Sequence, residues 1–174
     1  MTIIFLINKK GEVAMIYIKY GDIKGPVPEE GHKEWFAVDS IQLGIGRAIS
    51  AGTLDGKNRL NGDPSISEIV ITKRSDSASP ALFKESLNGE AKKVTIEFTR
   101  TGQDKSAKQE KYLTWELTDC MISGFSMSSG GDEPTESISL NFTKLEVSYV
   151  PFDATNKNKS PEKISFDLQK GQLS

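Results

Sequence analysis

The sequence predicts a mainly-β fold of antiparallel strands, with one short α-helix and one long extended loop. Three observations lead to this fold class. Apolar and polar residues alternate with period two through most of the chain. One segment carries the residues that start and stop a helix, and a glycine-rich stretch separates two of the strand patterns.

Two segments show the alternation most clearly, because single polar residues separate their apolar ones. These apolar residues are Val94, Ile96 and Phe98 in the first segment, and Leu113, Trp115 and Leu117 in the second. Such strands present one face to a core, and the polar stretch 102–111 between them is short enough for a hairpin. We expect further strands at residues 16–20, 67–73, 119–127 and 163–168. The stretch SSGGDEPTES (128–137) predicts a tight hairpin connection rather than an anion-binding nest.

The apolar parity switches at two places. The first switch is near Asp39–Ser40, after Phe36 and Val38 and before Ile41, Leu43 and Ile45. A β-bulge within one strand would produce it. The second switch is near Thr143–Lys144, between the sets Ile138, Leu140, Phe142 and Leu145, Val147, Tyr149. Here the chain either gains a residue or passes from one sheet to another.

The segment SDSASPALFKESLNGE predicts the helix. Ser79 is the expected cap, Pro80 the first helical residue and Asn88–Gly89 the stop. Leu82, Phe83 and Leu87 are expected to form the face that packs on the sheet. So short a helix needs such docking, because isolated helices below about 12 residues are marginal.

Composition excludes several classes of function. The 174 residues suit one domain, and 22 Lys plus Arg against 24 Asp plus Glu give no basic excess for nucleic acid. Cys120 is the only cysteine and His32 the only histidine, so an internal disulfide and a cysteine or histidine metal cluster are excluded.

We expect His32 to be a surface or packing residue before Trp35 and Cys120 to be a small buried apolar residue. A Cys120–His32 nucleophile pair stays open, although no motif supports it. We therefore predict no catalytic residue, no cofactor, no metal and no enzyme activity.

The N-terminal apolar run, residues 3–7, is too short for a signal peptide, and Lys9 and Lys10 follow it at once. No stretch approaches the about 18 apolar residues that a membrane span needs. We therefore expect no membrane insertion.

The glycine-rich stretch LGIGRAISAGTLDGKNRLNGDPSIS (43–67) fits neither phosphate-binding motif. Ile49 stands where a dinucleotide fingerprint needs its third glycine, and the P-loop spacing is also wrong. A flexible surface loop and an arm that contacts a partner both remain open. The arm is favoured because Ile45, Ile49, Leu54 and Leu60 would otherwise lie in water.

Several segments together resemble one family. They are IYIKYGDIKG, GHKEWFAVDSIQLGIGRAIS, SEIVITK, SPALFKESLNGE and MISGFSMSSGGDEPTESISLNFTKLEV, in this order. The sequence resembles the hemolysin-coregulated protein (Hcp) family, the inner-tube proteins of bacterial type VI secretion systems. The resemblance runs from about Met15 to the C-terminus. It implies one tube domain over residues 15–174, preceded by an extension of residues 1–14 that is an added strand or the product of a misassigned start codon.

The resemblance implies two antiparallel sheets in a β-barrel-like sandwich with the helix on its side. It also implies homohexameric rings that stack into a tube, a spike protein at the tube tip, a surrounding sheath and, in some members, small effectors in the lumen. Members are made in the bacterial cytoplasm and secreted without a signal peptide. A tube protein of another contractile injection system, such as a phage tail, and a stand-alone β-sandwich binding module are the alternatives.

In the family the long loop contacts neighbouring subunits. The predicted interface residues are Gly44, Ile45, Gly46, Arg47, Ile49, Leu54, Lys57, Arg59 and Leu60.

Overall fold

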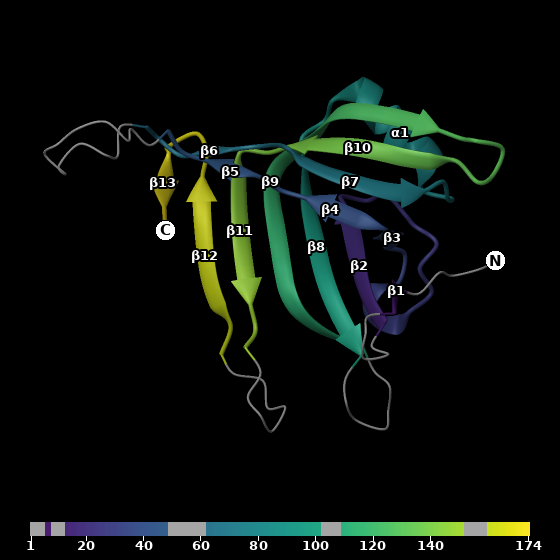
Figure 1. Ribbon diagram of the computed structural model, residues 1–174, viewed down its shortest axis with the longest axis horizontal. Helices are drawn as coiled ribbons and strands as arrows, with labels where there is room; N and C mark the ends of the chain where they lie inside the picture. The colour runs from purple at the N-terminus through teal and green to yellow at the C-terminus, as the bar shows by residue number, and fades with distance from the viewer. Residues whose placement is uncertain (1–5, 8–12, 49–61, 102–108, 152–159) are drawn as a thin grey trace, which may run out of the picture.

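The computed structural model describes residues 6–7, 13–48, 62–101, 109–151 and 160–174, and it is mainly β (Figure 1). The elements are β1 (Leu6–Ile7), β2 (Val13–Tyr20), the 3-10 turn η1 (Glu30–His32), β3 (Phe36–Val38), β4 (Ser40–Gln42), β5 (Ile45–Gly46), β6 (Ser65–Ile66), β7 (Ile69–Arg74), α1 (Ser79–Asn88), β8 (Lys92–Thr101), β9 (Gln109–Ser128), β10 (Thr135–Asn141), β11 (Lys144–Tyr149), β12 (Glu162–Asp167) and β13 (Gln172–Leu173).

Two antiparallel sheets form the body of the protein and share β9. Sheet A has the order β13–β12–β11–β9–β8–β2, with β1 and β3 both along the outer edge of β2. Sheet B has the order β9–β10–β7–β4. In the described part of the chain the other edges of the two sheets do not pair, so the architecture is a barrel-like sandwich and not a closed barrel. This confirms the predicted fold class.

The strand β9 makes the corner between the sheets. Its first half pairs with β8 and β11, and its second half pairs with β10. At the junction Asp119 has a φ of 47°, which is rare for a residue with a side chain. Thr143 holds this corner, since its backbone N–H donates to the Thr118 carbonyl at 3.1 Å and its Oγ1 to Asp119 Oδ2 at 3.1 Å.

Both parity switches are crossings between sheets. The switch near Thr143 takes the chain from β10 in sheet B to β11 in sheet A, which is one of the two predicted alternatives. The bulge predicted near Asp39 is wrong. β3 pairs with β2 in sheet A, whereas β4 pairs with β7 in sheet B, and the Asp39 N–H already bonds the Thr72 carbonyl at 2.8 Å. A crossing and a bulge leave the same parity signature in sequence.

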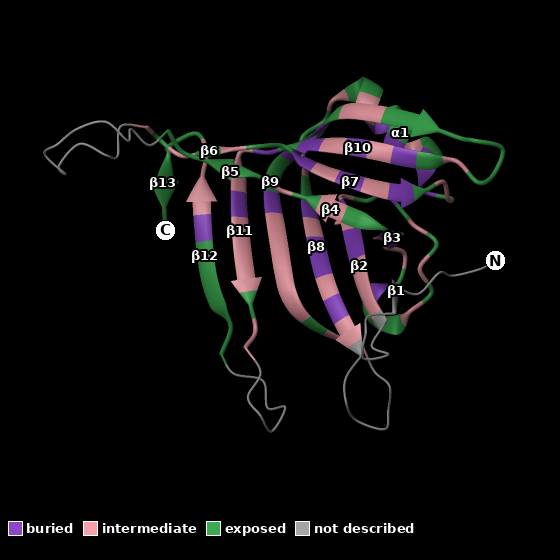
Figure 2. Cartoon of the chain, viewed as in Figure 1, coloured by how far each residue is buried: buried purple, intermediate pink, exposed green. Residues whose placement is uncertain are grey.

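The core lies where the two sheets overlap (Figure 2). The aliphatic strand residues that are at most 1% exposed come from both sheets: Ile18, Ile69, Ile71, Val94, Ile96, Leu117, Ile138 and Leu140. Fully burying a side chain of this size contributes about 1.5–3 kcal/mol to the free energy of unfolding.

The predicted strands 16–20, 67–73 and 163–168 are confirmed as β2, β7 and β12, and the hairpin at 128–137 is confirmed as the β9–β10 turn.

The helix α1 starts and ends close to the predicted residues, but its start works differently. Ser79 does not cap it. The Asp76 carboxylate accepts the N–H of Ala78 at 2.8 Å, and Ser79 Oγ accepts the N–H of Asp76 at 2.9 Å. Gly89 ends the helix in the left-handed conformation, with a φ of 66°, as the Asn–Gly pair predicted.

The predicted buried face of α1 is only partly right. Leu82 is buried, but Phe83 is 53% and Leu87 73% exposed. Successive helix residues are turned by about 100°, so the buried stripe at spacings of four and three residues consists of Ala78, Leu82 and Glu85. Because Glu85 carries a carboxylate, the spacing of apolar residues does not predict that it is buried.

Candidate functional site

The long loop predicted between residues 43 and 67 begins as a two-stranded stem. Ile45 of β5 lies opposite Ile66 of β6. Gly44 and Ser67 close the base, because the Ser67 N–H donates to the Gly44 carbonyl at 2.8 Å and the Gly44 N–H to Ser67 Oγ at 2.9 Å. Each end of the glycine-rich stretch 43–67 therefore contributes two residues to a strand.

Four of the nine predicted interface residues belong to the stem side of this loop. Gly44, Ile45, Gly46 and Arg47 are all exposed, and the Ile45 side chain is 68% exposed. Arg47 also serves the stem itself, since its Nε donates to the Gly62 carbonyl at 2.8 Å. The other predicted residues lie outside the described residues: Ile49, Leu54, Lys57, Arg59 and Leu60.

Sheet A extends beyond the cover that sheet B provides. Antiparallel partners share a face, so the register Ile96–Trp115–Val147–Ile164 continues the core face out to β12. On these outer strands the same face carries side chains that water reaches. Tyr149 is 44%, Ile164 58% and Leu173 72% exposed, and Figure 2 shows little buried surface on β11 to β13. We call Tyr149, Ile164, Phe166 and Leu173 the open apolar face.

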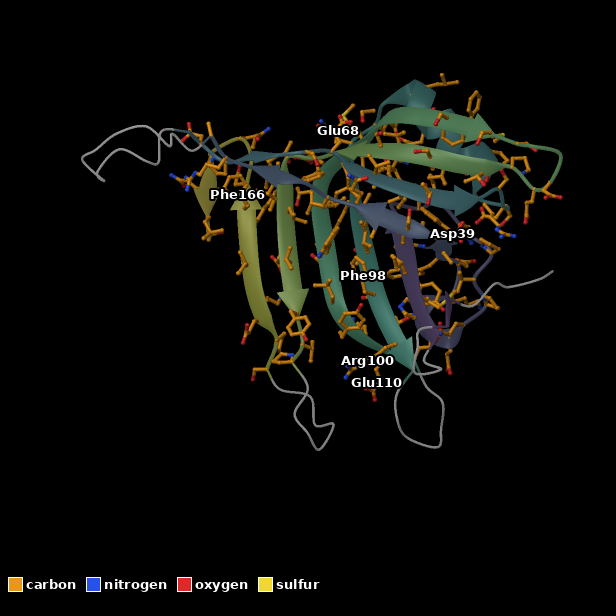
Figure 3. All side chains as sticks on the ribbon, viewed as in Figure 1. Asp39, Glu68, Phe98, Arg100, Glu110 and Phe166 are labelled. Carbon is orange, nitrogen blue, oxygen red and sulfur yellow. The ribbon has the colours of Figure 1, made fainter. Side chains whose placement is uncertain are left out.

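Aromatic rings continue this face toward the centre of sheet A. Phe98 and Trp115 meet edge to face with centroids 5.1 Å apart, and Tyr112 lies 6.5 Å from both Phe98 and Tyr149. Figure 3 places Phe98 on β8 and Phe166 on β12. Large rigid rings supply contact area at low conformational cost, which is why aromatic residues are enriched in protein interfaces.

A second exposed apolar surface belongs to α1. Phe83 and Leu87 are one helical turn apart, and the Phe83 ring packs on Phe125 of β9 with centroids 5.6 Å apart. Met127, two residues further along β9, is 54% exposed. We call Phe83, Leu87 and Met127 the helix patch. It lies at the end of the molecule away from β12 and β13 (Figure 1).

A buried ion pair escaped the sequence prediction. Lys73 and Glu136 are both 0% exposed, and Nζ lies 3.1 Å from the Glu136 Oε2. The pKa of Glu136 lies below its ordinary value, because hydrogen bonds to the carboxylate outweigh the burial that would raise it. A signal for this pair existed. Lys73 follows Ile71 at a spacing of two, and Glu136 precedes Ile138 at the same spacing, so strand parity puts both charges on the core face.

His32 and Cys120 are both buried, and they do not form a nucleophile pair. The His32 ring stacks on Tyr17 at 4.2 Å and meets Trp35 edge-on at 5.1 Å, which confirms its prediction as a packing residue. Its two nitrogens face the carboxylates of Glu29 and Glu97. Cys120 lies in the apolar core, where burial raises the pKa of its thiol to about 12.

Among the residues that the structure describes, no group of histidine, cysteine and acidic side chains could hold a metal ion. In the same part of the chain, no helix has the length and apolar character that a membrane crossing requires.

Comparison with known proteins identifies the family. Residues 17–149 match the family model described as "Type VI secretion system effector, Hcp". The chain is 27% identical over 160 residues to Protein hcp1 of Pseudomonas aeruginosa, covering 88% of this chain and 94% of the relative.

Solved structures agree at the level of the fold. A type six secretion system protein superimposes with a TM-score of 0.77 at 24% identity, covering 92% of this chain and 99% of the other. Hcp1 from Salmonella typhimurium does so with a TM-score of 0.71 at 21% identity and the same coverage.

Members of the family are secreted structural tube proteins that form oligomeric assemblies, and they are not enzymes. Because the family match runs from within β2 to the end of β11 and so covers more than half of the sequence, the chain belongs to the Hcp family of type VI secretion proteins.

Proposed function

We propose that this chain forms homohexameric rings in which the open apolar face of one subunit meets the helix patch of the next. The observation that carries the proposal is the presence of these two different exposed apolar surfaces at separate ends of the subunit. A closed ring with head-to-tail contacts needs two different surfaces on each subunit. A stand-alone binding module would need neither.

We propose that the rings stack into the secreted inner tube and that the arm of residues 44–62 joins neighbouring subunits. The exposed Ile45 supports this role for the arm, because its stem already presents an apolar side chain to water. By family resemblance the tube carries a spike protein at its tip, lies within a sheath and can hold small effectors in its lumen. Secretion without a signal peptide and a tube domain of residues 15–174 belong to the same proposal.

The ring is tested by changing Ile164 to Glu. A carboxylate placed in an apolar contact must lose its hydration, so we expect the variant to stay monomeric while the unchanged chain gives a hexamer. Native mass spectrometry measures both masses. Lys163→Ser is the matched control, because Lys163 is the preceding residue of β12, points to the opposite face and forms an ion pair with Glu146 that water reaches.

Two results would contradict the proposal. One is an unchanged chain that stays monomeric at micromolar concentration in low and moderate salt. The other is an Ile164→Glu variant that assembles as well as Lys163→Ser.

A further inference from the structure

A charged residue sets the orientation of α1 about its own axis. Successive helix residues are turned by about 100°, so residues two places before and two places after Glu85 point to nearly the opposite side of the helix. These residues are Phe83 and Leu87. Glu85 is only 6% exposed and faces the body of the subunit, and Phe83 and Leu87 therefore face water.

Apolar burial alone favours another orientation of α1. A helix turned with Leu82, Phe83 and Leu87 toward the sheets would remove large apolar side chains from water. It would also leave the Glu85 carboxylate hydrated, whereas burying a carboxylate is costly. In the structure Phe83 and Leu87 are each more than half exposed. A specific contact must therefore hold the helix in the orientation that is observed.

Lys92, the first residue of β8, makes this contact at the end of α1. Its Nζ lies 3.3 Å from Glu85 Oε2 and 3.0 Å from Asp22 Oδ1. The side chains of Lys92 and Glu85 are 19% and 7% exposed, so water screens this pair far less than an ion pair at the surface. The other Glu85 oxygen, Oε1, is buried and accepts no hydrogen bond from the described residues. The Lys92 ammonium therefore compensates the buried charge.

The path of the Lys92 side chain is fixed as well. A Cβ added to Gly21 would lie 2.7 Å from Lys92 Cδ, so the absence of a side chain at Gly21 leaves the room in which the lysine stem lies. The hydrogen bond to Asp22 raises the pKa of Lys92 above its ordinary value, although burial opposes the shift. The ammonium is therefore charged and held beside the last turn of α1.

The start of α1 is fixed by a different lysine. Lys73 Nζ lies 3.1 Å from Asp76 Oδ1 and donates to Ser79 Oγ at 3.2 Å. Each end of the helix is thus tied to the sheets by an ammonium group, and the last turn, which carries Leu87, depends on Lys92.

We propose that Lys92 is a positioning residue for assembly: through Glu85 it holds the last turn of α1 in the orientation that keeps Phe83 and Leu87 at the surface for a second copy of this chain. The inference rests on the proposed ring, which uses the helix patch. It adds that the patch is exposed against the preference of its own apolar side chains, by a contact within the subunit.

Lys92→Met tests the proposal, because removal of one partner of a buried ion pair leaves the other charge uncompensated. The Gly89 N–H donates to the Glu85 carbonyl at 3.0 Å, so hydrogen exchange of the Gly89 amide reports the last turn, and core amides of β9 report global unfolding. We expect Gly89 to lose its protection while the core amides keep theirs, since so short a helix has little stability of its own.

The same variant should assemble less readily. Only subunits with a closed last turn are competent for the ring, so half-assembly in native mass spectrometry should need at least about tenfold more protein. Lys93→Ser is the matched control, because Lys93 is the next residue of β8, is exposed and pairs with Glu116 at 2.8 Å. We expect this control to assemble like the unchanged chain.

The double variant Lys92→Met/Glu85→Leu separates positioning from a direct role of Lys92 in the ring. It removes both charges and places an apolar residue on the inward side of α1, so Gly89 protection and ring formation should both recover.

Three results would overturn the proposal: a Lys92→Met variant that keeps Gly89 protection, one that assembles as readily as Lys93→Ser, or a double variant that assembles as poorly as the single one. An unchanged chain that forms no ring would contradict the proposed function instead. Gly89 protection in that monomer would still decide whether Lys92 holds the last turn.

Discussion

Lys73 and Glu136 face each other across the β7–β10 pair, and neither is in contact with water. Removing two charges from water is costly, and their attraction offsets this cost only when hydrogen bonds satisfy the remaining atoms. The structure meets this condition. Lys73 Nζ also donates to the Arg74 carbonyl at 2.8 Å and Ser79 Oγ at 3.2 Å, and Ser75 Oγ donates to the second carboxylate oxygen at 2.8 Å. The pair therefore ties the start of α1 to sheet B.

Lys73→Met should lower the free energy of unfolding by about 3–5 kcal/mol, because it leaves the Glu136 carboxylate buried without its cation. Urea denaturation measures the loss. The double variant Lys73→Met/Glu136→Leu should recover much of it, because neither side chain is then charged. A double variant as unstable as the single one would show that the loss has another cause.

Acid should weaken the same contact. The pKa of Glu136 is lowered in the folded protein, so its contribution to stability is present above the ordinary glutamate range of about 4.3 and is lost as pH falls toward the folded value. We expect the stability of Glu136→Gln to depend less on pH than that of the unchanged chain between about pH 5 and about pH 2.5. Parallel pH profiles of the two proteins would contradict this.

At the scale of elements, the end of α1 depends on one backbone angle. Gly89 has a φ of 66°, and an added Cβ would meet only the Met121 side chain at an ordinary 3.5 Å, so space is not limiting. Gly89→Ala should therefore cost about 1–2 kcal/mol through backbone strain alone. Thermal denaturation tests this. Gly130→Ala is the control, because a Cβ there meets nothing within 4 Å and the φ of Gly130 is not in the left-handed region.

Replacing residues 48–62 by a short Gly-Ser linker should leave the subunit folded and abolish tube formation and secretion. The stem residues Gly44 and Ser67 remain to close the loop. Circular dichroism checks the fold, and electron microscopy with a secretion assay checks the assembly. A Gly-Ser linker of the original length separates the effect of loop length from that of the apolar side chains. Normal tubes from the shortened chain would favour a flexible surface loop instead.

The sequence predicts elements well where one face is apolar and the other polar, as in β8 and β10. It fails where two structures share one pattern. Asp39 marks a crossing that a bulge would mimic, and the short stem β5–β6 has too few residues to show any period. The exposure of the open apolar face could not be predicted from the sequence either. Ile164 follows the same alternation as a core residue, and it is exposed only because sheet B is too narrow to cover it.

At the scale of the whole molecule, residues 1–14 should be dispensable for ring formation. Among the residues that the structure describes, Leu6 and Ile7 of β1 pair with Ala14 and Val13 at the outer edge of β2, and the family match starts at residue 17. A chain that begins at Met15 should therefore give the same hexamer in native mass spectrometry. A truncated chain that folds but stays monomeric would show that β1 takes part in the ring.

The length of β9 has a mechanical consequence. This one strand of 20 residues pairs with β8 and β11 at one end and with β10 at the other. Unfolding of either sheet therefore breaks the pairing of half of a strand that also belongs to the other sheet. The subunit should therefore yield to heat or to a pulling force in a single step. Tension applied to sheet A would therefore reach sheet B along the covalent backbone of β9.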